Sequence, residues 1–164
     1  IRSVEIRNPQ VIAHPDAGQF AALLPGQTIV QMSRRGKFLT LHFAGGGRLC
    51  LHLRMSGQLL VMPADAPAEK HTHLILTLSD GRQLRYIDMR RFGRFWYFGK
   101  DETDDSTGLP RLGPEPDDPA LTAAYLQKTL GGCRRPIKEA LHDQTVVAGI
   151  GNIYSDEKIG RAHV

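Results

Sequence analysis

The sequence is poor in cysteine and in tryptophan, and it has no long apolar run. Its two cysteines, Cys50 and Cys133, are too few for a disulfide framework or for a four-thiolate zinc site within this chain. So few cysteines favour a reducing, cytoplasmic setting. No stretch approaches the roughly 20 consecutive apolar residues of a membrane helix, so we expect no membrane-spanning helix. With 41% hydrophobic and 23% charged residues, the composition is typical of a globular chain.

The charge is distributed unevenly along the 164 residues. The formal net charge is +4, but residues 31–100 contain 12 Lys or Arg and 4 Asp or Glu, a local net charge of +8. Residues 101–120 carry a net charge of −6. A concentrated positive charge is typical of proteins that bind polyanions, although charge alone is equally compatible with a solvated basic surface.

The first hundred residues have the pattern of short strands. Apolar and polar residues alternate in 39–43 and 49–53, with three glycines at 45–47 between them. Repeated turn signals at this spacing favour an antiparallel sandwich or barrel. A single helix is predicted from Asp16, as its N-cap, to about Leu24.

The pattern changes after residue 100. Residues 101–118 are acidic and rich in Pro, Gly, Ser and Thr, which is typical of a linker. Beyond them we predict a helix that starts near Asp118-Pro119 and ends at Gly131-Gly132. A second helix is predicted from Pro136 to His142, and a third after the glycine-rich stretch 147–152. The fold class is therefore α+β, with an antiparallel β-sandwich or barrel followed by the start of a helical domain.

Six segments combine Arg, Gly, His, Met and Asn in a distinctive order: Arg34–Leu39, His52–Gly57, Glu69–His73, Asp88–Gly93, Leu112–Pro116 and Asp143–Tyr154. In this order they resemble the bacterial formamidopyrimidine-DNA glycosylase family, which repairs oxidised purines. The resemblance extends over nearly the whole chain up to Glu157. The Met-Ser-Gly and Arg-Arg-Phe-Gly segments are more similar to the purine-lesion branch than to the related endonuclease VIII branch.

The resemblance implies a domain organisation. Residues 1–100 correspond to an N-terminal β-domain that lacks its first segment, 101–118 to a linker, and 119–158 to part of a helix–two-turn–helix domain. Members of the family begin with Pro-Glu after removal of methionine and end with a zinc finger of four cysteines. We therefore expect this chain to be a fragment without a cofactor of its own, and one structural zinc in the missing part of its parent.

The last six residues depart from the family pattern. Residues 159–164 read Ile-Gly-Arg-Ala-His-Val, the translation of a common sequencing adapter. We expect these residues to be a non-native tail.

The resemblance also implies an activity for the parent. It would be a bifunctional DNA glycosylase and abasic-site lyase that acts by β-elimination. Its substrate would be duplex DNA with 8-oxoguanine or a formamidopyrimidine opposite cytosine, bound by a monomer in the bacterial cytoplasm. The fragment itself is expected to be inactive because the nucleophilic proline is absent. Two alternatives remain: a non-catalytic duplex-DNA-binding relative on the same scaffold, and a small β-barrel RNA binder.

Lys37 is the one catalytic residue that the resemblance carries over to this chain. We expect it on a strand, where it would reach the lesion and its phosphate and donate a proton during elimination. A compact ammonium group on a flexible stem suits that role. A solvated surface lysine is the alternative.

Three further residues form the expected void-filling group. Met55, Arg90 and Phe92 would occupy the space that a flipped nucleotide leaves, with Arg90 donating to the orphaned cytosine. An apolar wedge such as Phe92 can unstack the neighbouring base step. Taken singly, Met55 and Phe92 are equally typical of a core, and Arg90 of an ion pair with Asp88.

The remaining expected DNA contacts lie in both halves of the chain. The resemblance assigns them to His52 and His71, although the His71-Thr72-His73 pattern is also weakly compatible with half a metal site. In the helical part, backbone N–H groups and side-chain donors would grip phosphates. The residues concerned are Arg134, Arg135, Lys138, Gly151 and Asn152.

Overall fold

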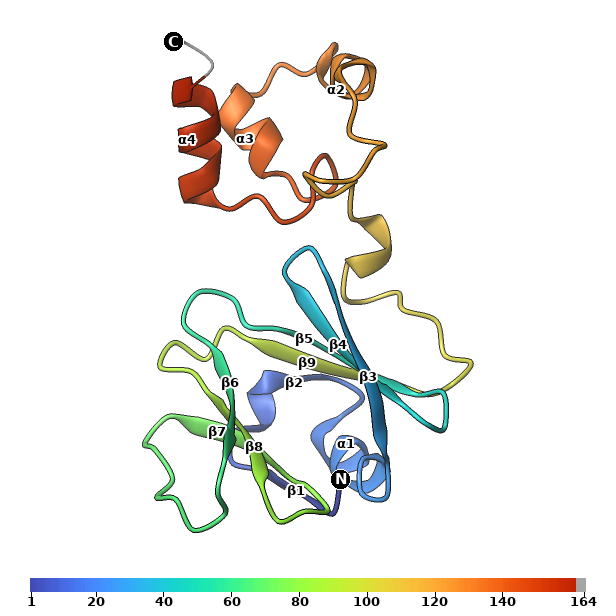
Figure 1. The fold of residues 1–164 in the computed structure, drawn as a ribbon, viewed down its shortest axis with the longest axis vertical. Coiled ribbons are helices and arrows are strands. Elements are labelled where there is room, and N and C mark those ends of the chain that lie inside the picture. The colour runs from blue at the N-terminus through green and yellow to red at the C-terminus, as the bar shows by residue number, and fades with distance from the viewer. Residues whose placement is uncertain (162–164) are drawn as a thin grey trace. The chain divides into compact units, whose positions relative to one another are not determined.

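The structure is a computed structural model that describes residues 1–161, and these fall into two compact units (Figure 1). The sheet unit comprises Ile1–Arg34 and Phe38–Thr107, and the helical unit comprises Arg35–Lys37 and the chain from Gly108 onward. The acidic segment is divided between them at residue 107. Residues 162–164 of the expected non-native tail lie outside the described residues, and residues 159–161 continue the last helix.

Two sheets form the sheet unit, as the alternating pattern predicted. The four-stranded sheet is antiparallel and contains, in spatial order, β1 (Ser3–Ile6), β7 (Thr72–Thr77), β8 (Gln83–Ile87) and β6 (Gln58–Met62). The five-stranded sheet contains β2 (Ile12–His14), β9 (Arg94–Phe98), β5 (Arg48–His52), β4 (Phe38–Phe43) and β3 (Ile29–Arg35).

The hairpin predicted around the three glycines is confirmed, because β4 and β5 pair antiparallel with Leu39 opposite Leu51. One pair departs from the antiparallel expectation: β2 runs parallel to β9 at the edge of the five-stranded sheet. Side-chain alternation has the same period in both pair types, so the sequence does not reveal strand direction.

Apolar side chains from both sheets make one core. Leu41, Leu49 and Leu51 of the larger sheet belong to the same buried cluster as Leu74 and Leu76 of the smaller one. Burying such side chains supplies about 1.5–3 kcal/mol each. The core therefore fixes the two sheets face to face and with them the loops at the sheet ends.

The helix α1 (Ala17–Leu23) closes this core. As predicted, Asp16 is its N-cap, and its carboxylate accepts hydrogen bonds from the N–H groups of Gly18 and Gln19 at 2.9 and 3.0 Å. Phe20 and Leu24 are fully buried. A 3-10 turn, η1 (Pro9–Val11), precedes it.

The helical unit contains η2 (Leu109–Arg111), α2 (Ala123–Leu130), α3 (Ile137–His142) and α4 (Asn152–Arg161). The expected start of α2 at Asp118-Pro119 is wrong. Asp118 instead closes a turn by accepting from the N–H of Ala120, and Thr122 caps the helix by accepting from the N–H of Tyr125 at 3.0 Å. Gly131 ends α2 and Pro136 lies at the N-cap of α3, both close to the predicted positions.

A small apolar cluster holds the helical unit together. Val146, Val147 and Ile150 are buried, and three leucines of the α2 region pack against them.

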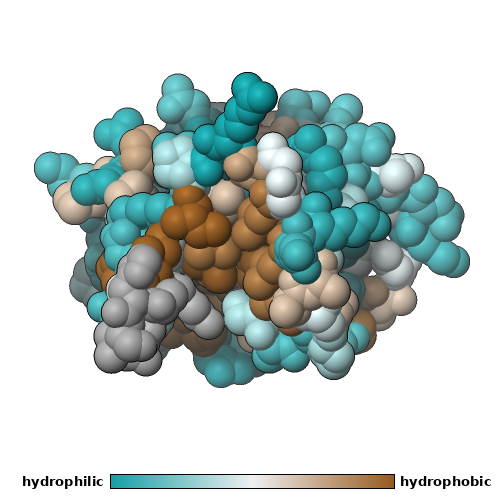
Figure 2. All heavy atoms as spheres, turned by 90° about the horizontal axis from the view of Figure 1, so that it is seen from above, coloured by the Kyte–Doolittle hydropathy of each residue, from teal (hydrophilic) through white to brown (hydrophobic). Residues whose placement is uncertain are grey.

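Apolar side chains also lie on the surface of the molecule. Figure 2 shows them gathered in the middle of the face it draws, bordered by hydrophilic ones. Among the described residues, no helix has the length and apolar character needed to cross a bilayer.

Candidate nucleic-acid interface

Two loops of the sheet unit carry the expected void-filling residues. The Met55 loop (residues 53–57) joins β5 to β6, and the Phe92 loop (residues 88–93) joins β8 to β9. The guanidinium Nη1 of Arg90 lies 3.3 Å from the sulfur of Met55, so the structure brings these two residues together. Met55 is 74% exposed and Phe92 is 51% exposed. Exposed apolar side chains of this size, beside a guanidinium, are available to a ligand and contribute little to the core.

Asp88 binds both loops through its carboxylate. Its Oδ1 accepts hydrogen bonds from the Ser56 hydroxyl at 2.5 Å and from the N–H of Arg90 at 3.1 Å. Its Oδ2 accepts from the Tyr86 hydroxyl and from two further N–H groups of the Phe92 loop, at 2.6–3.1 Å. The residue is 1% exposed. Five donors therefore satisfy a buried carboxylate that would otherwise be strongly unfavourable.

These donors govern the titration of Asp88. Burial alone would raise the pKa of this carboxyl, but the hydrogen bonds from Ser56, Tyr86 and the N–H groups of Gly93 and Arg90 hold the pKa well below its usual range. Conversely, burial and the bond to Asp88 raise the pKa of the Tyr86 hydroxyl. The aspartate is thus ionised and the tyrosine neutral at any physiological pH.

We expect this carboxylate to make stability pH-dependent. Asp88→Asn should destabilise the sheet unit by about 2–3 kcal/mol at neutral pH, because a charged acceptor of several buried donors is lost. Since the folded-state pKa lies below the unfolded value of about 4, the difference from the wild type should be full above about pH 5 and shrink as the pH falls below about 4. Urea unfolding at several pH values measures it, with the exposed Asp65→Asn as control. A difference that stays constant down to about pH 3 would contradict this assignment.

Backbone strain is concentrated in the same two loops. Arg54 and Arg91 both have a φ of 59°, and in residues 1–161 they are the non-glycine residues recorded in the left-handed region. Arg54 directly precedes Met55, and Arg91 directly precedes Phe92. Such strain persists only where the surroundings enforce it, and it is typical of functional sites.

Lys37 lies in the turn between β3 and β4, so the expectation of a strand position is wrong. Gly36 has a φ of 56° and reverses the chain there. The ammonium of Lys37 donates to the carbonyl of Ile150 at 2.9 Å, and partial burial lowers its pKa from the ordinary value. A Cβ built on Gly151 would lie 3.7 Å from this ammonium, which places Lys37 beside the glycine-rich turn.

Gln144 holds that turn in place, and sequence reasoning missed it. Its side-chain NH₂ donates to the carbonyl of Ile150 at 2.8 Å and its oxygen accepts from the N–H of Gly149 at 2.9 Å. Asn152 begins α4 directly after the turn and is exposed. The turn therefore presents Lys37, Gly151 and Asn152 within one local structure.

The predicted cations near α3 are partly neutralised. Arg135 pairs with Asp143 at 3.0 Å and Lys138 with Asp156 at 2.7 Å, while Arg134 is exposed in the segment between α2 and α3. The basic side chains of these pairs are 50% and 43% exposed, so the pairs contribute little to stability. Their cations remain accessible to a phosphate.

The histidines divide between surface and interior. The Nδ1 of half-buried His52 accepts from the N–H of Arg54, and the ring meets Phe38 edge-on. His71 lies just before β7, where its carbonyl accepts from the N–H of Asp88. His73 is buried with its Nε2 2.7 Å from the carbonyl of Asp88, so this imidazole supports the Phe92 loop.

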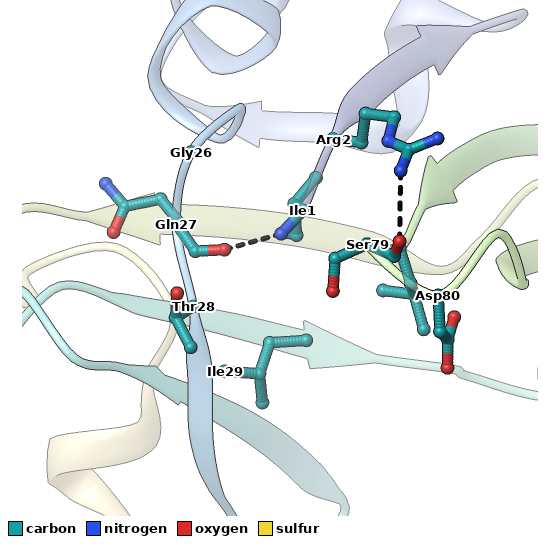
Figure 3. A pocket seen from close by; sticks show the side chains of 9 residues that line it. Ile1, Arg2, Gly26, Gln27, Thr28, Ile29, Ser79 and Asp80 are labelled. Carbon is teal, nitrogen blue, oxygen red and sulfur yellow. Dashed lines mark hydrogen bonds between the residues drawn. The ribbon is translucent and has the colours of Figure 1, made fainter.

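A pocket in the sheet unit contains none of the predicted site residues. It is lined by residues near the start of the chain together with 26–29 and 78–80. Figure 3 shows the α-amino group of Ile1 donating to the carbonyl of Gln27, and Arg2 donating to the carbonyl of Ser79. These two bonds join residues 1 and 2 to the segments 26–29 and 78–80 of the same unit.

Two models of known protein domains match the chain. The family model of the formamidopyrimidine-DNA glycosylase N-terminal domain matches residues 1–95, and that of the H2TH domain matches residues 112–164. The chain thus combines the two domain types that these models describe. It belongs to the formamidopyrimidine-DNA glycosylase family.

Individual relatives agree with this assignment. The chain is 48% identical over 164 residues to the formamidopyrimidine-DNA glycosylase of Moorella thermoacetica, and 46% identical over 165 residues to that of Bacillus subtilis. All of this chain is covered in both, and it spans 60% and 59% of the relatives' lengths. The Lactococcus lactis enzyme, solved bound non-covalently to DNA containing an AP site, matches with a TM-score of 0.86 and 37% identity over 96% of this chain and 60% of that one.

Proposed function

We propose that the protein containing this chain is a base-excision DNA repair enzyme that removes oxidised purines, such as 8-oxoguanine and formamidopyrimidines, from duplex DNA. It acts as a glycosylase and as an abasic-site lyase by β-elimination. The observation that carries the proposal is the juxtaposition of Met55 and Arg90, with Phe92 exposed on the same loop as Arg90. Family membership and the relatives solved with DNA support it.

The sheet unit would recognise the gap that is left when a base is flipped. Flipping costs a few kcal/mol in lost stacking and pairing, and side chains that fill the gap offset this cost. Phe92 would enter the base step, Met55 would fill irregular space, and Arg90 would donate to the unpaired cytosine. The net charge of +8 over residues 31–100 would attract the phosphate backbone.

The helical unit would hold the duplex. Lys37, Gly151 and Asn152 offer an ammonium, an accessible backbone and an amide around one turn, a combination suited to phosphate oxygens. In the parent, Lys37 would also donate a proton during elimination. His52, His71, Arg134, Arg135 and Lys138 would add contacts, and a structural zinc would lie in the part of the parent outside this chain.

We expect this chain to bind duplex DNA that contains a stable abasic analogue opposite cytosine more tightly than intact duplex, by about tenfold or more, because the flipping cost is absent. Phe92→Ala should remove most of this preference while leaving the weaker, salt-sensitive binding to intact duplex. Fluorescence anisotropy at two salt concentrations measures both.

The control is Val61→Ala, which removes an exposed apolar side chain from β6 in the same unit. Equal affinity of the wild type for the two duplexes would contradict the proposal. Tighter binding to single-stranded RNA than to either duplex would favour an RNA-binding function instead.

A further inference from the structure

We propose that Asp88 is a positioning residue that sets the Met55 loop and the Phe92 loop in register, so that Met55, Arg90 and Phe92 enter DNA as one unit. The inference rests on the proposed function and assigns a role to a residue that would not touch DNA. Asp88 is almost fully buried, so it would act on DNA only through the loop residues that donate hydrogen bonds to it.

The five hydrogen bonds of the carboxylate are divided between the loops in a specific way. Oδ1 is shared by the Ser56 hydroxyl of one loop and the N–H of Arg90 of the other. Ser56 directly follows Met55, and Arg90 is the residue whose guanidinium meets the Met55 sulfur. A single oxygen atom therefore fixes the relative position of the two loops at the point where their functional side chains meet.

The second oxygen fixes Phe92. Oδ2 accepts from the N–H groups of Phe92 and Gly93 at 2.9 and 3.1 Å, and from the Tyr86 hydroxyl at 2.6 Å. These bonds curl the backbone around the carboxylate and leave the Phe92 ring at the surface. The left-handed Arg91 between Arg90 and Phe92 makes this curl possible, at an energetic cost that the charge-assisted bonds offset.

The backbone of Asp88 is itself tied to a third segment. Its N–H donates to the carbonyl of His71 at 3.0 Å, and its carbonyl lies 2.7 Å from the Nε2 of buried His73. Asp88 is thus attached to β7 as well as to β8, which it directly follows. Because these bonds hold the backbone of Asp88 in place, its carboxylate has a fixed position. The hydrogen bonds to the carboxylate then hold both loops in one arrangement.

The close packing of both loops around Tyr86 leaves little room for a different arrangement of the loops. A Cβ on Gly57 would lie 2.4 Å from the Leu53 carbonyl and 2.9 Å from the Tyr86 ring, and one on Gly93 would lie 1.9 Å from the Tyr86 hydroxyl. Both loops therefore close onto the same phenol, which in turn donates to Asp88. Such preorganisation lowers the ordering cost of inserting the side chains into DNA.

The test compares Asp88→Asn with Asp80→Asn, which makes the same charge change in an exposed turn of the smaller sheet. Asp80 accepts bonds from Arg82 alone among its recorded partners. Three quantities are measured on the 164-residue chain: affinity for abasic-analogue and intact duplexes, fluorescence of a 2-aminopurine beside the analogue, and hydrogen exchange of both loops in the free chain.

We expect Asp88→Asn to lower the preference for the abasic duplex about tenfold and to suppress the 2-aminopurine response, while its affinity for intact duplex stays like that of Asp80→Asn. Hydrogen exchange should quicken in both loops together. An unchanged preference, or faster exchange in the Phe92 loop alone, overturns the inference.

Ser56→Ala provides a second variant in case Asp88→Asn does not fold. It removes the donor that links the loops and leaves the other four bonds of the carboxylate. A reduced preference and faster exchange in the Met55 loop support the inference, and wild-type values for both overturn it. A wild-type chain without any abasic preference contradicts the proposed function itself, and with it the role in DNA that the loops are given.

Discussion

The 164-residue polypeptide is expected to cleave no DNA strand at 8-oxoguanine, and borohydride is expected to trap no covalent adduct between it and the lesion strand. The proposed chemistry needs an amine that attacks C1′ and forms a Schiff base. The family resemblance assigns this role to an N-terminal proline, and a polypeptide prepared from residues 1–164 alone presents the amine of Ile1 in its place. The Ile1 amine also donates to the Gln27 carbonyl at 2.5 Å (Figure 3).

The measurement is denaturing electrophoresis of labelled duplex after incubation with and without borohydride, with a full-length relative such as the Bacillus subtilis enzyme as positive control. Lys37 and Lys138 carry the side-chain amines among the proposed DNA contacts, and the lowered pKa of Lys37 leaves it more easily deprotonated than an exposed lysine. An adduct that disappears in Lys37→Ala would show that this lysine serves as a nucleophile, contrary to the expectation.

Gly93→Ala is expected to destabilise the sheet unit by about 3 kcal/mol, or about 15 °C in Tm for a unit of this size. The new Cβ would lie 1.9 Å from the Tyr86 hydroxyl and 3.1 Å from the His52 carbonyl. Tyr86 is fully buried and cannot move away without breaking its bond to Asp88. Displacing either group also disturbs the Phe92 loop.

Thermal unfolding followed by circular dichroism measures this effect. The matched control is Gly45→Ala in the turn between β4 and β5, where the nearest atom to the new Cβ is the Gln27 side-chain oxygen at 3.7 Å. We expect that change to stay within about 0.5 kcal/mol. Equal stability of the two variants would show that the loop backbone rearranges readily around Tyr86.

Elements set by local chemistry could be predicted from the sequence. The alternation in 39–43 and 49–53 located β4 and β5, Asp16 marked the start of α1, and Pro136 marked that of α3. Where two local signals competed, prediction failed. Asp118 and Thr122 are both good caps, and only the folded chain shows that the first closes a turn and the second begins α2.

Only part of the candidate site could be predicted, because short motifs identify residues but not the contacts that the fold makes between distant segments. Met55, Arg90 and Phe92 were identified from their resemblance to a family pattern, and the structure places Arg90 against Met55. Asp88 was considered only as an ion-pair partner of Arg90. Instead it accepts the backbone N–H of Arg90 together with donors from Ser56 and Tyr86, which no sequence spacing relates.

The sequence by itself determined the strand-rich first part, the helical second part and the family, because these depend on periodicity, caps and short motifs. The tertiary structure decided which residues meet. Lys37 reaches the Ile150 carbonyl across 113 residues, and the Asp88 carboxylate collects donors from two loops 32 residues apart. Such contacts arise because burying the core fixes the ends of the strands, and a buried charge must then be satisfied by whichever donors the fold has brought within reach.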